Sequence, residues 1–464
     1  SINFIVKMIF GFIKNLIYET KNHFNYKVNR AIIAGEILAK INDSSKVIST
    51  KEDFIQACQA YTDSKHKQVV KDLQASIRKA IANVESSKLF DATNIYGQLN
   101  TEDLLKVLNE LSNQYYFSSS NTETGLDELM IKIAAVKASD SILDPTSGFK
   151  GAWLAILKEN PKQKITIQEI EEDFIALAYL NAIVIGADNF EIFQGDVLAD
   201  PKYIFGKKLE LFDKVITFPP VSLKLNKEAI NDNKFNRFRY GKVGMRADYA
   251  FISNDIASLK DKGKAVIAVA DGPLFQSGST AKIRQNLVDE DLVEAVISLP
   301  SRLFTMASVP LNLLVINKDK KDFKGKIQFI NGNQAEWYRH DKVANILTST
   351  GVEEIAKIYN DKVEKDGIST IISNADYKDT LSVKKYILPT EITIDNHKYH
   401  INKENLKKNN SLSLEQLVEI KRGFNVTQKN ESATGKYLAI LMIRKSTKLS
   451  CHALIFQRIQ HVTC

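Results

Sequence analysis

The sequence predicts an α/β protein in which a helical N-terminal domain precedes a mostly parallel sheet covered by helices on both faces. From about residue 28 to 136, apolar residues recur every three or four positions, the spacing of amphipathic helices. From about 141 to 331, short apolar runs alternate with helical stretches, which favours parallel pairing because each crossover helix covers one face of the sheet. Polar residues also follow several of the expected strands, and they locate a candidate site.

The clearest helix of the N-terminal part begins near Asn100. Leu104 and Leu108 share one face of it, and Glu102 places a negative charge in the first turn, where the helix dipole favours it. Either Asn100 or Thr101 can cap the free N–H groups of this turn.

The strands expected in the second part are short apolar runs bounded by turn residues. They are Ser141–Leu143, Lys164–Gln168, Phe190–Phe193, Phe212–Thr217, Ala265–Ala270, Leu292–Leu299, Leu313–Asn317 and Ile327–Ile330. The helices expected between them are Ala152–Leu157, Glu171–Ile185, Asp248–Leu259 and Thr280–Val288. The last three strands have no long helix between them, so an antiparallel edge is expected.

Composition changes divide the chain into four parts. The polar run SSSNTETG ends the helical region, a Lys-, Asp- and Asn-rich stretch follows the sheet, and regular periodicity is lost after Ile440. That loss is expected from a truncated or frameshifted reading frame, although a natural tail remains an alternative. The expected domains are 1–125 (helical), 126–335 (the α/β sheet), 336–410 (an extension of it) and 411–464.

The charge balance allows a polyanionic partner without requiring one. The chain has 464 residues, with 63 Lys+Arg against 55 Asp+Glu and a formal net charge of +8. An excess of this size fits an ordinary solvated surface or contact with DNA.

Cysteine usage and the N-terminus indicate a cytoplasmic protein without a membrane span. The three cysteines, Cys58, Cys451 and Cys464, are too few for a disulfide framework, and none has metal-ligand spacing. No metal site is therefore expected. The apolar run at 1–17 is interrupted by Lys7 and Lys14, which makes it too short and too polar to cross a bilayer.

Four successive strand ends carry residues that could hold a ligand. They are the glycine turn at 144–151 with Asp144, Thr146, Gly148 and Gly151, then Glu169, then Asp196, and then the Pro-Pro loop Phe218, Pro219, Pro220 and Val221. Glycine lets a backbone approach a ligand closely, and an acid at the next strand end can accept hydrogen bonds from ribose hydroxyls. Each feature alone also occurs at ordinary strand ends, but four in this order are far more specific.

Together with the run Tyr240–Asn317, these motifs resemble the DNA adenine-N6 methyltransferases, and more narrowly the modification subunits of type I restriction–modification systems. The runs ADYAFI, DGPLF and EAVISLP extend the similarity beyond the site. The resemblance implies a Rossmann-like methyltransferase sheet, S-adenosyl-L-methionine as cofactor, double-stranded DNA as substrate, and other restriction–modification subunits as partners.

The resemblance also implies a role for each strand end. Asp144 and the glycine turn would face the methionine end of the cofactor, Glu169 would hold the ribose, and Asp196 would meet the cofactor adenine. The loop after the fourth strand would hold the target adenine, flipped out of the duplex.

Two loop residues depart from the Asn-Pro-Pro-Phe/Tyr motif of that family. Phe218 stands in place of the hydrogen-bonding Asn and Val221 in place of the stacking ring, whereas Pro219 keeps its carbonyl. Phe149 and Lys150 stand where the family has small residues, and their bulk is expected to weaken cofactor binding. The departures predict reduced activity and leave open a second interpretation, a non-catalytic DNA-binding or scaffold subunit that retains the methyltransferase fold.

Two further segments are candidates for recognition of DNA. Arg237, Arg239, Lys242 and Arg246 are interleaved with aromatic residues, a pattern that suits a DNA backbone and also a solvated loop. The segment LEQLVEIKRGFNVT, at 414–427, resembles the beginning of a target-recognition domain of a specificity subunit.

Overall fold

The computed structural model describes residues 25–43, 48–82, 84, 99–116, 125–231, 233–303, 310–340, 345–387, 391–394 and 397–400. The chain divides into two compact units, Ser1–Leu388 and Pro389–Cys464. The described part of the second unit is a hairpin of β14 (Glu391–Ile394) and β15 (His397–His400). The expectations for residues 1–17, 414–427 and the tail after Ile440 concern residues outside the described ranges.

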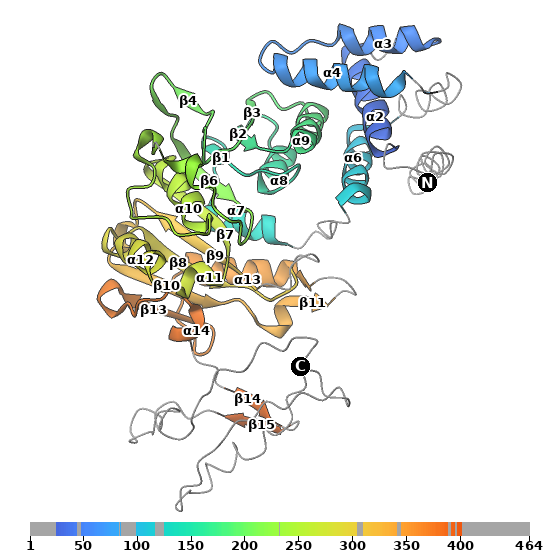
Figure 1. Ribbon diagram of the computed structural model, residues 1–464. Coiled ribbons are helices and arrows are strands. Elements are labelled where there is room, and N and C mark those ends of the chain that lie inside the picture. The colour runs from blue at the N-terminus through green and yellow to red at the C-terminus, as the bar shows by residue number, and fades with distance from the viewer. Residues whose placement is uncertain are drawn as a thin grey trace, which may run out of the picture. The chain divides into compact units, whose positions relative to one another are not determined.

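A nine-stranded sheet forms the centre of the first unit (Figure 1). Its order is β13-β10-β8-β9-β7-β6-β1-β2-β3. The strands are β1 (Ser141–Asp144), β2 (Lys164–Glu169), β3 (Phe190–Gln194), β6 (Phe212–Thr217), β7 (Leu259–Ala270), β8 (Val293–Ser298), β9 (Leu311–Asn317), β10 (Lys326–Asn331) and β13 (Ser369–Ser373). The predicted α/β class with a mostly parallel sheet is confirmed, and eight of these strands coincide with the predicted ones apart from their ends.

The predicted antiparallel edge is wrong in its position. The antiparallel strand β9 lies inside the sheet, between β7 and β8, and β8 pairs in parallel with β10. All seven residues of β9 are buried, which an edge strand would not allow. The antiparallel strand at the edge is β13, which the sequence did not predict because Ser369–Ser373 is short and only partly buried.

Helices cover both faces of the sheet and alternate with the strands, as expected. They include α7 (Leu126–Ala134), α8 (Ala152–Glu159), α9 (Glu172–Ile185), α10 (Asp248–Ala257), α11 (Gly272–Phe275), α12 (Ser279–Asp289) and α13 (Ser349–Asn360). Successive residues of β7 belong to different buried clusters. Val266 packs in the one that holds Trp153 and Ile355, and Ile267 in the one that holds Phe251. This alternation is what a sheet with two covered faces requires.

The N-terminal part is helical, as predicted. It contains α2 (Asn25–Asn42), α3 (Lys51–Ala60), α4 (Lys67–Ile81) and α6 (Thr101–Tyr116). The cap of α6 is Asn100, whose Oδ1 accepts a hydrogen bond from the backbone N–H of Asp103 at 2.9 Å. Tyr61, after α3, lies 3.0 Å from the hydroxyl of Tyr179 on α9, so these helices contact the sheet domain directly. Among the residues that the structure describes, no helix is long and apolar enough to span a membrane.

Candidate functional site

The four strand ends singled out in the sequence lie at one edge of the sheet. β6, β1, β2 and β3 are neighbours in that order and run parallel, so their C-terminal ends meet. β7, β8 and β10 run in the same direction, and the loops that follow them belong to this edge too. We call it the carboxyl edge. Open α/β sheets bind their ligands at such an edge.

Asp144 connects β1 with β6 through hydroxyl groups. Its Oδ1 accepts a hydrogen bond from Thr217 Oγ1 at 2.7 Å and from the backbone N–H of Thr146 at 3.2 Å. The hydroxyls of Thr146 and Thr217 are 2.7 Å apart. Thr217 immediately precedes Phe218, so this chain of hydrogen bonds joins the glycine turn to the Pro-Pro loop.

Burial raises the pKa of Asp144 to about 7, because a charged carboxylate loses solvation there. The hydrogen bonds from Thr217 and Thr146 oppose that rise, and the nearby negative charge of Glu169 adds to it. A carboxyl group with a pKa near neutrality is typical of a functional site.

Glu169 holds the glycine turn in place. One carboxylate oxygen accepts from the N–H of Gly148 at 2.8 Å, and the other accepts from Ile170 at 2.8 Å and Glu171 at 3.0 Å. A carboxylate has about four lone-pair sites, so capacity for a further donor remains. The structure therefore brings Asp144, Gly148 and Glu169 together, as the sequence predicted.

The two glycines of the turn have different roles: Gly148 allows an unusual backbone conformation, and Gly151 avoids placing a side chain beside Asp144. Gly148 has φ +57°, a left-handed backbone that favours glycine. A Cβ at Gly151 would lie 3.6 Å from Asp144 Oδ2 and 3.5 Å from the ring of Trp153. Glycine thus leaves open the space beside the buried carboxylate.

Asp196, half-buried after β3, forms a local turn in which its Oδ1 accepts from the N–H of Leu198 at 2.9 Å. The loop that carries it is tied to β2. The N–H of Gly195 donates to the carbonyl of Glu169 at 2.9 Å, and Nε2 of Gln168 donates to the carbonyl of Gly195 at 3.1 Å. The third strand end is thus fixed beside the second.

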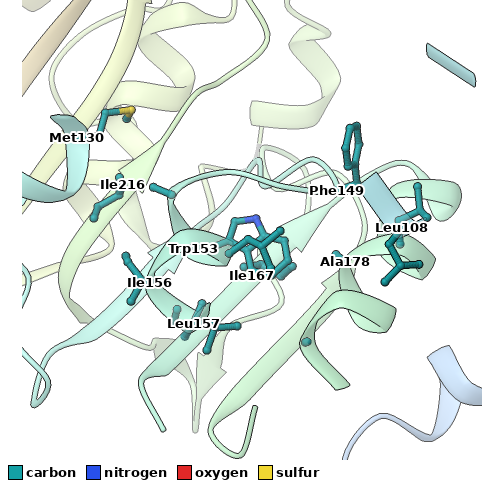
Figure 2. Packing of buried hydrophobic residues seen from close by; sticks show 14 of the residues in the cluster. Leu108, Met130, Phe149, Trp153, Ile156, Leu157, Ile167, Ala178 and Ile216 are labelled. Atoms are coloured by element: carbon teal, nitrogen blue, oxygen red, sulfur yellow. The ribbon is translucent and has the colours of Figure 1, made fainter. Parts of the chain in front are cut away.

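Phe149 does not project into the turn as a bulky obstacle. Its side chain is 7% exposed and packs in the hydrophobic cluster that contains Leu108 of α6 (Figure 2). Its ring centroid is 5.3 Å from that of Phe174 on α9. Lys150 donates to Asn109 Oδ1 of α6 at 3.1 Å. Phe149 and Lys150 therefore join the glycine turn to the helical domain.

The Pro-Pro loop begins directly beyond the hydroxyl network. Phe218 and Val221 are half-buried, Pro219 is buried and Pro220 is exposed. The ring of Phe218 packs against the same cluster that holds Phe149. A phenyl ring offers no hydrogen-bond acceptor, so the backbone carbonyls are the acceptors that this part of the loop provides.

The chain after the Pro-Pro loop leaves the carboxyl edge near Leu223 and returns to it near Met245. Leu225 N–H donates to the carbonyl of Met245 at 2.9 Å, and Ala247 N–H donates to that of Leu223 at 2.9 Å. These bonds hold the segment before α10 beside the Pro-Pro loop at the carboxyl edge.

The structure corrects the prediction for two of the four basic residues. The side chain of Arg237 is 0% exposed, and its guanidinium donates to the carbonyls of Val197 and Leu198, each at 2.7 Å. Arg237 therefore organises the loop and does not face a nucleic acid. Arg239 forms an ion pair with Glu290, at 2.7 Å, beyond the last residue of α12. That end of α12 precedes β8 and lies away from the carboxyl edge.

For the other two basic residues, contact with DNA stays a prediction. Lys242 and Arg246 are exposed, and Arg246 lies on the returning strand of the loop, where its guanidinium donates to the carbonyl of Ser222. The four residues are close in sequence but do not form one surface.

The sequence did not give Thr217 or Gln168 a role of its own. Thr217 ends the expected strand Phe212–Thr217 and begins the loop at 217–222, and a Thr at the last position of a strand before a Pro-Pro loop is a signal that could identify it. Gln168 is fully buried, and its Oε1 accepts from the N–H of Lys202 at 2.9 Å. A buried amide at a strand end requires such partners.

The carboxylate acceptors at these strand ends suit a ligand with a cationic group, hydroxyls and an amino group. Asp144, Glu169 and Asp196 place acids at three neighbouring strand ends, and Gly151 keeps open the space beside the first. Among the described residues there is no cluster of three or more His, Cys, Asp or Glu able to hold a metal ion.

Comparison with known proteins agrees with this geometry. The family model "N-6 DNA Methylase" matches residues 114–395, more than half of the chain. The methylase subunit of the type I restriction enzyme MjaVII of Methanocaldococcus jannaschii is 27% identical over 70% of this chain and 65% of its own length. The methylase subunit of MjaVIII of the same organism is 30% identical over 60% of this chain and 52% of its own length. The chain thus spans between half and two thirds of these relatives.

A solved structure shares the fold. The methyltransferase subunit of a type I restriction–modification system from Streptococcus thermophilus superimposes with a TM-score of 0.61 at 21% identity, covering 76% of this chain and 79% of that one. With a family model matched over most of the sheet domain, the chain belongs to the N-6 DNA methylase family.

Proposed function

We propose that this protein transfers a methyl group from S-adenosyl-L-methionine to N6 of adenine in double-stranded DNA, as the modification subunit of a type I restriction–modification system. The observation that carries the proposal is the hydrogen-bonded connection from Asp144 through Thr217 to the Pro-Pro loop. It places a glycine turn with acids and a loop suited to an extruded base on neighbouring strands.

The cofactor residues have distinct roles in this proposal. Asp144 would pair with the positively charged end of the cofactor, Glu169 would accept from a ribose hydroxyl, and Asp196 would accept from the adenine amino group. The cofactor, when bound, supplies an electrophilic methyl group on a sulfonium. The chain's own contribution is to hold that group at the carboxyl edge, beside the loop.

The target side of the site offers fewer contacts. The carbonyl of Pro219 can accept a hydrogen bond from the adenine amino group, which orients its nitrogen for attack. Phe218 offers no second acceptor and Val221 no ring. Loss of one positioned hydrogen-bonding group costs roughly 10²–10³ in rate, and loss of a stacking ring about 1–3 kcal/mol of base binding. We therefore infer slow methyl transfer.

The names of the relatives support a role inside an assembly. Both are methylase subunits of type I restriction enzymes. Partners that supply sequence recognition would then bring the duplex to the carboxyl edge.

Phe218 also favours a second candidate function. A chain that keeps the fold but lacks the acceptor could serve as a non-catalytic DNA-binding or scaffold subunit beside an active copy. The two functions differ in cofactor binding, because a scaffold needs no methyl donor.

Isothermal titration calorimetry with S-adenosyl-L-methionine tests the proposal. Saturable one-to-one binding that is weakened by Asp144→Asn, but not by Asp188→Asn on the exposed turn before β3, is the expected result. Absence of binding by a folded sample would reject the methylase and favour the scaffold.

A further inference from the structure

Of the four basic residues that the sequence predicted to contact DNA, Lys242 and Arg246 remain candidates, because both are exposed. A duplex held with one base at the Pro-Pro loop needs its flanking phosphates neutralised, because phosphate contacts supply most of the affinity and fix the register. The carboxyl edge carries other exposed arginines, which the sequence did not single out.

Arg302 is one of them. It follows β8, is exposed, and has φ +60°, a backbone conformation that a non-glycine residue rarely adopts. Its carbonyl accepts a hydrogen bond from the N–H of Asn345 at 2.7 Å, and Nδ2 of Asn345 donates to the carbonyl of Ser301 at 2.6 Å. The loop is thus held from a second element, and the strained backbone is fixed.

That second element is a two-stranded ribbon of β11 (Tyr338–His340) and β12 (Asn345–Leu347). Trp337, Tyr338 and Leu347 are buried and anchor the ribbon, whereas Arg339 and His340 are exposed. Because the ribbon begins shortly after β10 and is bonded to the loop after β8, it lies at the carboxyl edge. Arg302 and Arg339 therefore lie at the same edge of the sheet, and we call the loop after β8 together with the ribbon the ribbon surface.

The spacing suits a duplex. β8 is three strands from β6 in the sheet order, and β10 is four. At about 4.8 Å per strand, the ends of β8 and β10, from which the ribbon surface extends, lie roughly 14–19 Å from the end of β6, where the Pro-Pro loop begins. This is comparable with the major groove, about 12 Å wide, plus the backbone that borders it.

The guanidinium groups of Arg302 and Arg339 can each bind a phosphate group. No ion pair joins Arg302 or Arg339 to an acid within the part of the chain that the structure describes, in contrast to Arg239, which is paired with Glu290. A guanidinium presents donors in a planar fork that matches phosphate oxygens.

We propose that the ribbon surface, through Arg302 and Arg339, binds the DNA phosphate backbone beside the target base. The inference rests on the proposed function, which makes duplex DNA the substrate. It replaces Arg237 and Arg239 of the sequence prediction by two residues that lie about 60 to 100 positions further along the chain.

Fluorescence anisotropy with a labelled duplex, measured across a salt series, tests the proposal on the full chain. Each phosphate contact contributes about 0.9 to the slope of log affinity against log salt. Arg302→Gln and Arg339→Gln should each lower the slope by about 0.9 and weaken binding to all sequences alike, whereas Arg302→Lys should restore most of it. Arg239→Gln is the matched control and should leave the slope unchanged.

Unchanged slopes for both Arg302→Gln and Arg339→Gln would overturn the inference, as would a reduced slope for Arg239→Gln alone. Absence of salt-dependent DNA binding by the unaltered chain would overturn it too. Calorimetry of cofactor binding on the same samples separates these failures from failure of the proposed function, since the ribbon variants should bind S-adenosyl-L-methionine normally. Circular dichroism checks that they fold.

Discussion

The two halves of the carboxyl edge differ in where their unusual side chains lie. The cofactor half consists of the ends of β1, β2 and β3, and the target half consists of the Pro-Pro loop. In the cofactor half, over β1, β2 and β3, the unusual Phe149 is buried with Leu108 and Phe174, and the acids remain in place. In the target half, which is the Pro-Pro loop at 218–221, Phe218 is half-buried and offers no side-chain hydrogen-bond acceptor. We therefore expect the consequence of an unusual motif residue to depend on where its side chain lies, and to be larger at Phe218 than at Phe149.

The halves also differ in electrostatics. The cofactor half contains a buried carboxyl group, Asp144, whose pKa is raised to about 7. The target half presents apolar side chains and exposed cations. A cationic cofactor and a polyanionic substrate would accordingly meet opposite charges at one edge of the sheet.

The largest expected effect concerns the contact between the cofactor turn and α6. Phe149→Ala should lower the free energy of unfolding by about 3–5 kcal/mol, because it removes a buried ring. Urea denaturation measures this, with Phe205→Ala, a site 83% exposed, as control. A loss below about 1 kcal/mol for Phe149→Ala would show that the turn does not depend on this packing.

Repair of the target half is the next largest change. Phe218→Asn combined with Val221→Phe should raise adenine methylation by roughly 10²–10³, because it restores an acceptor and a ring. Incorporation of labelled methyl groups into unmethylated DNA measures the rate, with Phe205→Asn as control. Equal rates before and after repair would place the defect elsewhere.

Removal of the buried acid tests the cofactor half. Asp144→Asn should weaken cofactor binding about 10–100-fold at pH 8, the value of a hydrogen bond to a charged group. In the unaltered chain affinity should rise between pH 6 and 8, because Asp144, with its pKa raised to about 7, becomes ionised over that range. Calorimetry at several pH values should find this rise absent in the variant.

The same raised pKa has a consequence for folding. Because the folded-state pKa of Asp144 exceeds its unfolded value, ionisation opposes folding progressively from about pH 4 to 7. Asp144→Asn should therefore be more stable than the unaltered chain at pH 8, with the advantage lost near pH 4. A variant that is less stable at both pH values would contradict the raised pKa.

The smallest effect is expected at Thr217. Thr217→Val removes the donor that stabilises ionised Asp144, so the midpoint of the pH profile should move upward by up to about one unit. Thr217→Ser keeps the hydroxyl and should leave the midpoint near its original value. If Val and Ser give the same midpoint, the hydrogen bond does not tune Asp144.

Local patterns predicted most of the fold and the position of the cofactor half. The helix after Asn100 and the strands up to β6 follow from periodicity, and the acids at their ends meet because parallel strands share an edge. The position of β9 could not be predicted, since its sequence suits any buried strand and its partners are chosen by tertiary packing. The burial of Arg237 could not be predicted from its neighbours in sequence either. A buried arginine is recognised only from the carbonyls that surround it in the folded chain.

The central claim is that the cofactor half is intact and the target half is impaired. The most direct test measures cofactor binding and adenine methylation on one preparation of the unaltered chain, beside the Phe218→Asn, Val221→Phe variant. We predict saturable binding of S-adenosyl-L-methionine with similar affinity in both, and methylation roughly 10²–10³ slower in the unaltered chain. Absence of binding, or methylation by the unaltered chain at the rate of the repaired variant, would contradict the account.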